Sequence, residues 1–188
     1  MPEMLHPKQL CGALLLMIIS HTGRAQADSA SLVPYIRAAA DSMTAAFSRQ
    51  DFKAFVNYSN PRLVEMLGGR ESFINFMERQ VSALKGMRFN IVRAGRILRV
   101  IPGSQPMQCI VEQWLELDYQ GSPVAGVSHL IGISDDGKSW TFADGNSDAG
   151  NNIKLLIPGI SPLLVIPKKK QVFGVKLDSL LKDYRTVY

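Results

Sequence analysis

Hydrophobic side chains in the first half of the chain recur at the spacing of a helix. Over residues 31–47 they return every three or four positions, and Ser31 can cap the helix that this spacing predicts. Asp51 can begin a second, shorter helix, and a third is expected over 71–84, after the break at Gly68-Gly69. The pattern therefore predicts three amphipathic helices. Their apolar faces carry Val33, Ile36, Ala40, Met43, Phe47, Phe52, Phe55, Val56, Phe73, Phe76, Met77, Val81 and Leu84.

The following stretch alternates between apolar and polar residues, as a half-buried strand does. Over 107–119 one side carries apolar residues and Gln113, while the other carries acidic and amide residues. The sequence Asp135-Asp136-Gly137 is typical of a hairpin turn. Helices followed by antiparallel strands indicate an α+β fold, with the helices on one face of the sheet. Further strands are expected over 88–93, 96–101, 124–134 and 138–144.

The tail beyond residue 151 is strongly apolar and is interrupted by Pro158, Pro162 and Pro167. An apolar surface of this extent is expected to be covered, either by the sheet or by a partner subunit. Residues 177–188 are expected to form a terminal helix.

The N-terminus has the features of a secretory signal peptide over residues 1–27. Lys8 supplies a positive charge, 10–19 are apolar, and Ala25-Gln26-Ala27 offers a cleavage site. The apolar run is shorter than the roughly 20 residues that span a bilayer, so no transmembrane segment is expected in the mature chain. The alternative is an N-terminal membrane anchor. We therefore expect a secreted or periplasmic protein, with one domain over 28–160 and a C-terminal extension over 161–188.

Charge and cysteine content exclude several classes of function. The net charge of +5 falls to +4 when Lys8, Arg24 and Glu3 leave with the signal. The run of lysines over 168–170 is expected to be a solvated turn, because nucleic-acid binding needs a larger basic patch with aromatic residues. Cys109 alone would remain after cleavage, so no intrachain disulfide is expected, and its apolar neighbours indicate a buried, inert thiol.

The order of these elements resembles the NTF2-like (SnoaL-like, cystatin-like α+β) superfamily over about residues 31–144. That resemblance implies a curved antiparallel sheet folded around three helices into a cone with an apolar cavity, and relatives that commonly form dimers. Its members include ketosteroid isomerases, scytalone dehydratase, polyketide cyclases and epoxide hydrolases, together with non-enzymatic binding domains. The resemblance rests on Ala45-Ala46-Phe47, the run 51–58, Pro61, Gly68-Gly69, Asp118-Tyr119 and the aromatic strand 140–144.

Five residues are candidates for a site in such a cavity. His129 is the only histidine left after signal removal, so it acts alone as acid, base or donor, or is a hydrogen-bonded structural residue. Asp144 either abstracts a proton, with its pKa raised by apolar walls, or begins a turn. Tyr58 either presents its hydroxyl to the cavity or packs. Gln113 needs a polar partner on the inward face, and Trp140 completes the expected ligand-binding set of Gln113, Tyr58, His129 and Trp140.

Neither a metal nor a cofactor is expected, and the alternative for the loop 144–148 is an ion site looser than an EF-hand. The loop 144–148 is acidic, but an EF-hand needs glycine at its sixth position and glutamate at its twelfth, where this chain has Ala149 and Leu155. A lone histidine does not supply the usual zinc ligands. No P-loop, dinucleotide fingerprint or nucleophile elbow is present in the sequence.

The leading hypothesis is a secreted, non-enzymatic domain that binds a small apolar ligand or a partner, as a homodimer without nucleic acid. The first alternative is a cofactor-free isomerase, dehydratase or hydrolase-like enzyme in which Asp144, His129 and Tyr58 converge on one pocket. The second alternative is a structural domain that dimerises by its sheet, with a filled cone and an exposed apolar sheet face.

Overall fold

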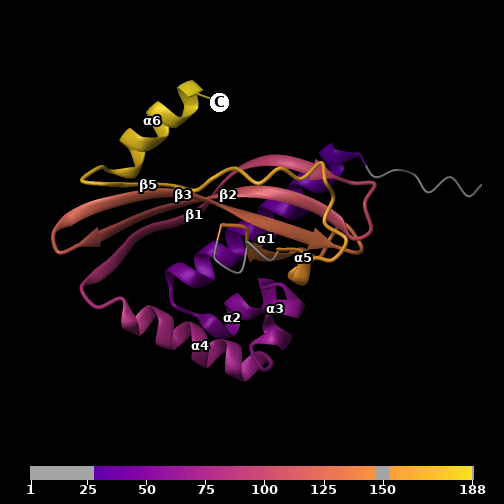
Figure 1. The fold of residues 1–188 in the computed structure, drawn as a ribbon, viewed down its shortest axis with the longest axis horizontal. Helices are drawn as coiled ribbons and strands as arrows, with labels where there is room; N and C mark the ends of the chain where they lie inside the picture. Colours follow the sequence, from indigo (N-terminus) through magenta and orange to yellow (C-terminus); the bar gives the residue numbers. More distant parts are fainter. Residues whose placement is uncertain (1–27, 147–152, 188) are drawn as a thin grey trace, which may run out of the picture.

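The computed structural model describes residues 28–146 and 153–187, and the expected signal peptide lies outside the described residues. The chain folds as α+β, with helices first and an antiparallel sheet afterwards, as predicted (Figure 1). The helices are α1 (Ser29–Ser48), α2 (Phe52–Phe55), the 3-10 helix η1 (Val56–Tyr58), α3 (Pro61–Met66), α4 (Arg70–Ala83), α5 (Ile153–Leu156) and α6 (Leu177–Val187). The strands are β1 (Met87–Ile101), β2 (Met107–Tyr119), β3 (Ser122–Ser134), β4 (Thr141–Asp144) and β5 (Lys170–Phe173).

Side-chain caps define where the N-terminal helices begin. Asp28, rather than Ser31, caps α1 by accepting a hydrogen bond from the Ala30 amide. Asp51 caps α2, as expected from the sequence. Asn60 caps α3, and Pro61 suits its first turn because it needs no amide donor there. The apolar patch over 63–67 is thus part of a separate helix, so the prediction of three helices was too low.

The described sheet has the order β1-β2-β3-β4, and every pairing is antiparallel. β3 pairs with β2 along one edge, and with β4 and β5 at separate places along the other. The two strands expected over 88–93 and 96–101 form one strand, β1, whose register shifts near Ala94 accommodate the irregular stretch. The last strand begins only at Thr141, because Asp136 accepts the amide hydrogens of Lys138 and Ser139 and holds the preceding residues in a turn.

Both faces of the sheet are covered. Helices α2–α4 lie below the sheet in Figure 1, and α6 lies above it. On the helical side, Cys109, Val111, Leu130 and Phe142 belong to a core shared with α1, α2 and α4. The opposite face packs against residues that follow position 152: Leu156, Ile157, Leu164, Leu177, Leu180, Leu181 and Tyr184.

The C-terminal segment is therefore buried against the sheet, which was one of the two arrangements predicted for it. Gln108 holds it in place by donating to the Gly159 carbonyl at 2.7 Å and accepting from the Ser161 amide at 2.8 Å. Glu116 accepts a hydrogen bond from the Leu177 amide, 2.8 Å away, where α6 begins. The expectation that the polar side of residues 107–119 faces solvent was wrong, since Gln108 and Glu112 are fully buried.

None of the described helices combines the length and the apolar character that crossing a bilayer requires.

Gly132 should be intolerant of any side chain. A Cβ atom there would lie 2.5 Å from Cys109 Sγ and 2.7 Å from Phe142 Cε1, in the closed part of the core. We expect Gly132→Ala to lower the free energy of unfolding by about 2 kcal/mol, measured by urea denaturation.

Gly126→Ala is the matched control on the same strand, because its Cβ would lie 3.4 Å from the nearest atom, the Lys170 carbonyl oxygen. We expect it to change stability by less than about 1 kcal/mol. Equal effects of the two substitutions would contradict the packing described for β2, β3 and β4.

Candidate functional site

A pocket of about 500 Å³ lies between the N-terminal helices and the inner face of the sheet. Most of its wall is aromatic or aliphatic, contributed by α1–α5 and by β1–β4. Its polar lining residues are Ser59, Gln80, Gln113 and Asp144. Its apolar lining residues are Met43, Phe47, Phe55, Leu63, Leu67, Phe73, Phe76, Met77, Phe89, Val92, Leu115, Leu130, Phe142 and Leu156.

A cluster of aromatic rings builds the helical side of the pocket. The ring centroids of Phe47 and Phe55 are 5.6 Å apart, and those of Phe55 and Phe73 are 6.2 Å apart. Phe47 also meets Phe89 of β1 edge to face, with 5.4 Å between centroids. These separations are those of favourable ring pairs, so the rings support one another and hold this wall in place.

Gln113 and Asp144 are the candidate residues that line the pocket. Gln113 lies on the inner face of β2, and its amide oxygen accepts a hydrogen bond from the Ser128 hydroxyl at 3.2 Å. Asp144 ends β4, and its Oδ1 accepts the Asn146 amide hydrogen at 2.8 Å. The structure thus supplies the polar partner that Gln113 was expected to need.

His129 lies on the opposite face of the sheet. Its neighbour Leu130 lines the pocket, and because side chains alternate along β3, His129 points into the layer beneath the C-terminal segment. The imidazole is fully buried, and its Nδ1 lies 2.9 Å from the side-chain oxygen of Asn146. That oxygen only accepts, so Nδ1 carries the proton, while Nε2 has no partner among the described residues.

The surroundings of His129 favour the neutral ring. Burial lowers its pKa, and the hydrogen bond to Asn146 and the charges of Glu112 and Asp144 only partly oppose that effect. Asn146 in turn donates to the Pro167 carbonyl at 2.9 Å. Asn146 therefore links His129 to the C-terminal segment.

Tyr58 and Trp140 border another surface hollow, formed with Tyr35 and Ser42 of α1. Trp140 is buried, and its indole nitrogen donates to the Gly137 carbonyl at 3.1 Å. Tyr58 is half-buried against the core. Asp144, His129 and Tyr58 consequently do not converge on one pocket, contrary to what the enzyme hypothesis requires.

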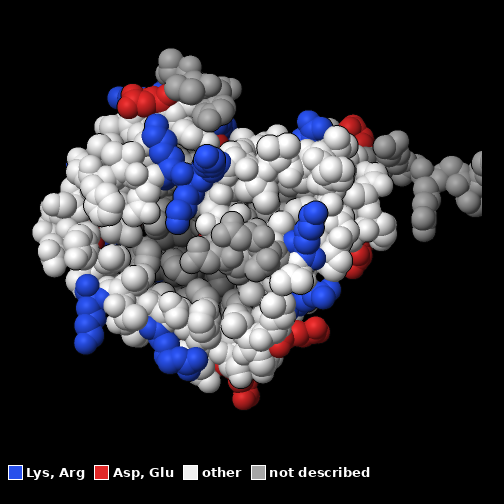
Figure 2. Space-filling model, viewed as in Figure 1, with Lys and Arg blue, Asp and Glu red and all other residues white. Residues whose placement is uncertain are grey.

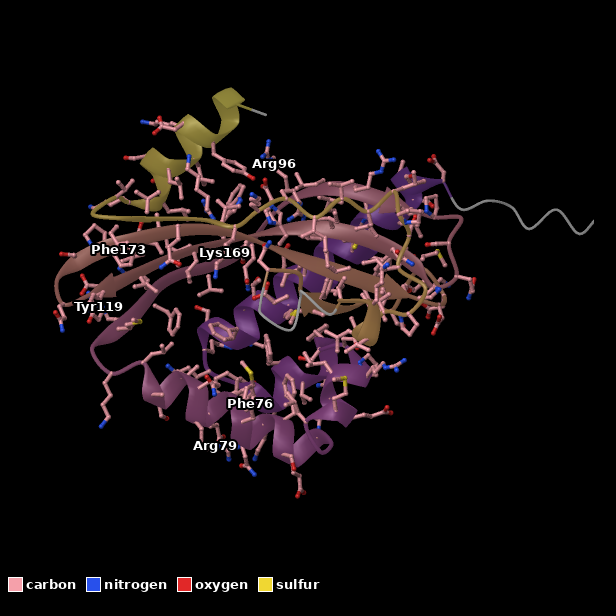
Figure 3. The ribbon with its side chains drawn as sticks, viewed as in Figure 1. Phe76, Arg79, Arg96, Tyr119, Lys169 and Phe173 are labelled. Carbon is pink, nitrogen blue, oxygen red and sulfur yellow. The ribbon has the colours of Figure 1, made fainter. Side chains whose placement is uncertain are left out.

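A buried carboxylate on the outer face of the sheet was missed by sequence reasoning. Glu112 accepts hydrogen bonds from the Arg96 side chain at 2.7 and 3.0 Å, from the Arg96 amide, and from the Trp114 indole. Burial raises the pKa of Glu112, but the hydrogen bonds and charge of Arg96 outweigh it, so the pKa is lowered and the carboxylate stays ionised. Arg96 also stacks over the Tyr184 ring of α6, on the upper side of the sheet in Figure 3.

Cys109 is a buried free thiol. Burial raises the pKa of the Cys109 thiol to about 12, so it is protonated at neutral pH. Within the described ranges, no group of three or more histidine, cysteine, aspartate or glutamate side chains comes close enough to hold a metal ion. Part of the acidic loop 144–148 lies outside those ranges.

No protein-family model, curated protein or solved structure matches this chain.

The buried, neutral His129 should make the protein less stable in mild acid. Folding lowers the pKa of His129, so the unfolded chain takes up the proton at a higher pH than the folded chain does. The stability contributed by the neutral ring is therefore fully present above the ordinary pKa of about 6.5 and is lost as the pH falls below that value. We expect the free energy of unfolding to decrease between about pH 8 and about pH 5.5, above the range where carboxylates titrate. In His129→Gln, urea denaturation at the two pH values should show a decrease less than about half as large. An undiminished pH dependence in that variant would show that His129 is not the group responsible.

Proposed function

We propose that this protein is a secreted, NTF2-like domain that binds a small, mostly apolar molecule in the pocket between its helices and its sheet, without catalysing a reaction. The observation that carries the proposal is the pocket itself. Its volume of about 500 Å³ lies within the range of small-molecule sites, and its wall is largely aromatic and aliphatic, with a few polar groups that can orient a ligand.

The positions of the candidate residues favour binding over catalysis. Acid–base catalysis requires groups placed around one reacting atom. Asp144 lines the pocket, but His129 lies across the sheet and Tyr58 borders a different hollow. A pocket with one carboxylate and a largely apolar wall supports recognition better than proton transfer.

A purely structural role through the sheet face has less support. That hypothesis expects a filled interior and an exposed apolar face, whereas the interior holds a pocket and the outer face packs against residues 153–184. A homodimer through this face would first have to displace the chain's own C-terminal segment.

A tryptophan placed in the pocket should block it. Met77 of α4 lines the pocket, and Met77→Trp adds a bulky ring where space is open. We expect this variant to weaken binding of the neutral fluorescent probe N-phenyl-1-naphthylamine by at least about tenfold, which corresponds to about 1.4 kcal/mol. Its melting temperature should be retained, because the ring fills a space and does not displace packed atoms.

The matched control is Glu78→Trp, which places the same ring on an exposed position of the same helix that does not line the pocket. We expect less than about a twofold change in probe affinity. Equal probe binding by the two variants, or no saturable binding by the unmodified protein, would contradict the proposal.

A further inference from the structure

We propose that the ligand is a single-chain amphiphile with an anionic head group, whose apolar tail fills the pocket while Lys169 and Arg79 attract the head at the opening. This inference rests on the proposed function, because it specifies the chemistry of the same ligand. It follows from the basic side chains around the opening of the pocket. These side chains are not among the residues that line the pocket.

The opening lies among basic side chains. Figure 2 shows a hollow in this face of the molecule with lysine and arginine side chains around it, while the visible acidic side chains lie toward the margins. Lys169 lies on the sheet side of the hollow, and Arg79 lies on the side formed by α4 (Figure 3). Phe76, from the same helix as Arg79, lines the pocket.

Both cations are available to a ligand. Lys169 and Arg79 are exposed, and neither forms an ion pair with a carboxylate of the described residues. Two basic side chains on opposite sides of an apolar opening create a positive potential that attracts an anion and leaves an uncharged tail unaffected. Because the side chains are exposed, each contributes modestly, and salt should weaken the effect.

Asp144 is a like charge for an anionic head group. It lines the pocket but is exposed at the end of β4, so the head is expected to lie nearer to Lys169 and Arg79 than to Asp144. The favourable arrangement therefore keeps the anionic head beside the two cations and the tail against the aromatic wall. A cationic amphiphile would experience the reverse: attraction to Asp144 and repulsion from Lys169 and Arg79.

The test compares three ligands that share one tail and differ in the charge of the head: laurate, dodecanol and dodecylammonium. Each displaces N-phenyl-1-naphthylamine from the mature chain, residues 28–188, below its critical micelle concentration. We expect laurate to bind more tightly than dodecanol and dodecylammonium to bind most weakly. Raising the salt concentration should weaken laurate binding and leave dodecanol binding nearly unchanged.

Charge variants then assign the effect to the two cations. The double variant Lys169→Met and Arg79→Met should weaken laurate binding about fivefold and dodecanol binding less than about twofold. Asp144→Asn should strengthen laurate binding, because it removes a like charge. Lys138→Met is the control. It removes one positive charge at a residue that borders a different hollow, so it should leave laurate binding unchanged.

The outcomes separate this inference from the proposed function. Equal affinity for the three ligands, or laurate binding that the double variant does not weaken, would overturn the head-group inference while leaving apolar binding intact. A preference for dodecylammonium that Asp144→Asn abolishes would reverse the sign of the charge and also overturn it. A different result would overturn the proposed function itself: none of the three ligands displaces the probe, and Met77→Trp binds the probe as tightly as the unmodified protein does. The probe would then bind outside the pocket.

Discussion

The continuous antiparallel pairing of β2 with β3 determines which side chains face the helices and which face the C-terminal segment. The two strands pair continuously from Met107 and Ser134 to Tyr119 and Ser122, without a register shift. Because successive side chains point to opposite faces, this register sends Val111 to the helices and Ile110 to the C-terminal segment. A slip by one residue would exchange the two faces, and would turn Glu112 toward the apolar core.

The same register places the pocket. Leu115 and Leu130 form part of its floor, and the aromatic side chains of the helices form the opposite wall without filling the space between them. The outer cover reinforces this floor from behind, because α6 and the segment before it bury the reverse side of the same strands. Glu112, held by Arg96, keeps a charge within that cover only because its hydrogen bonds compensate for burial.

Local sequence signals predicted the parts of the fold that local chemistry determines. The alternation of apolar and polar residues predicted the bounds of the strand over 107–119, and the residue type predicted the helix cap at Asp51. Gln113 was expected on the inner face because it alternates with apolar residues, and it lines the pocket. The side of the sheet on which His129 lies could not be predicted, because its strand has small or apolar residues on both faces. The burial of Glu112 was equally hidden, because the outer face of the sheet is covered by residues that follow position 152, some forty or more positions later in the chain.

Native mass spectrometry tests directly whether the pocket holds a small apolar molecule. The masses of the purified protein under native and denaturing conditions would be compared. We expect an added small-molecule mass in the native spectrum that disappears on denaturation and is absent from Met77→Trp. A native spectrum with no adduct, even after incubation with laurate and dodecanol, would contradict it.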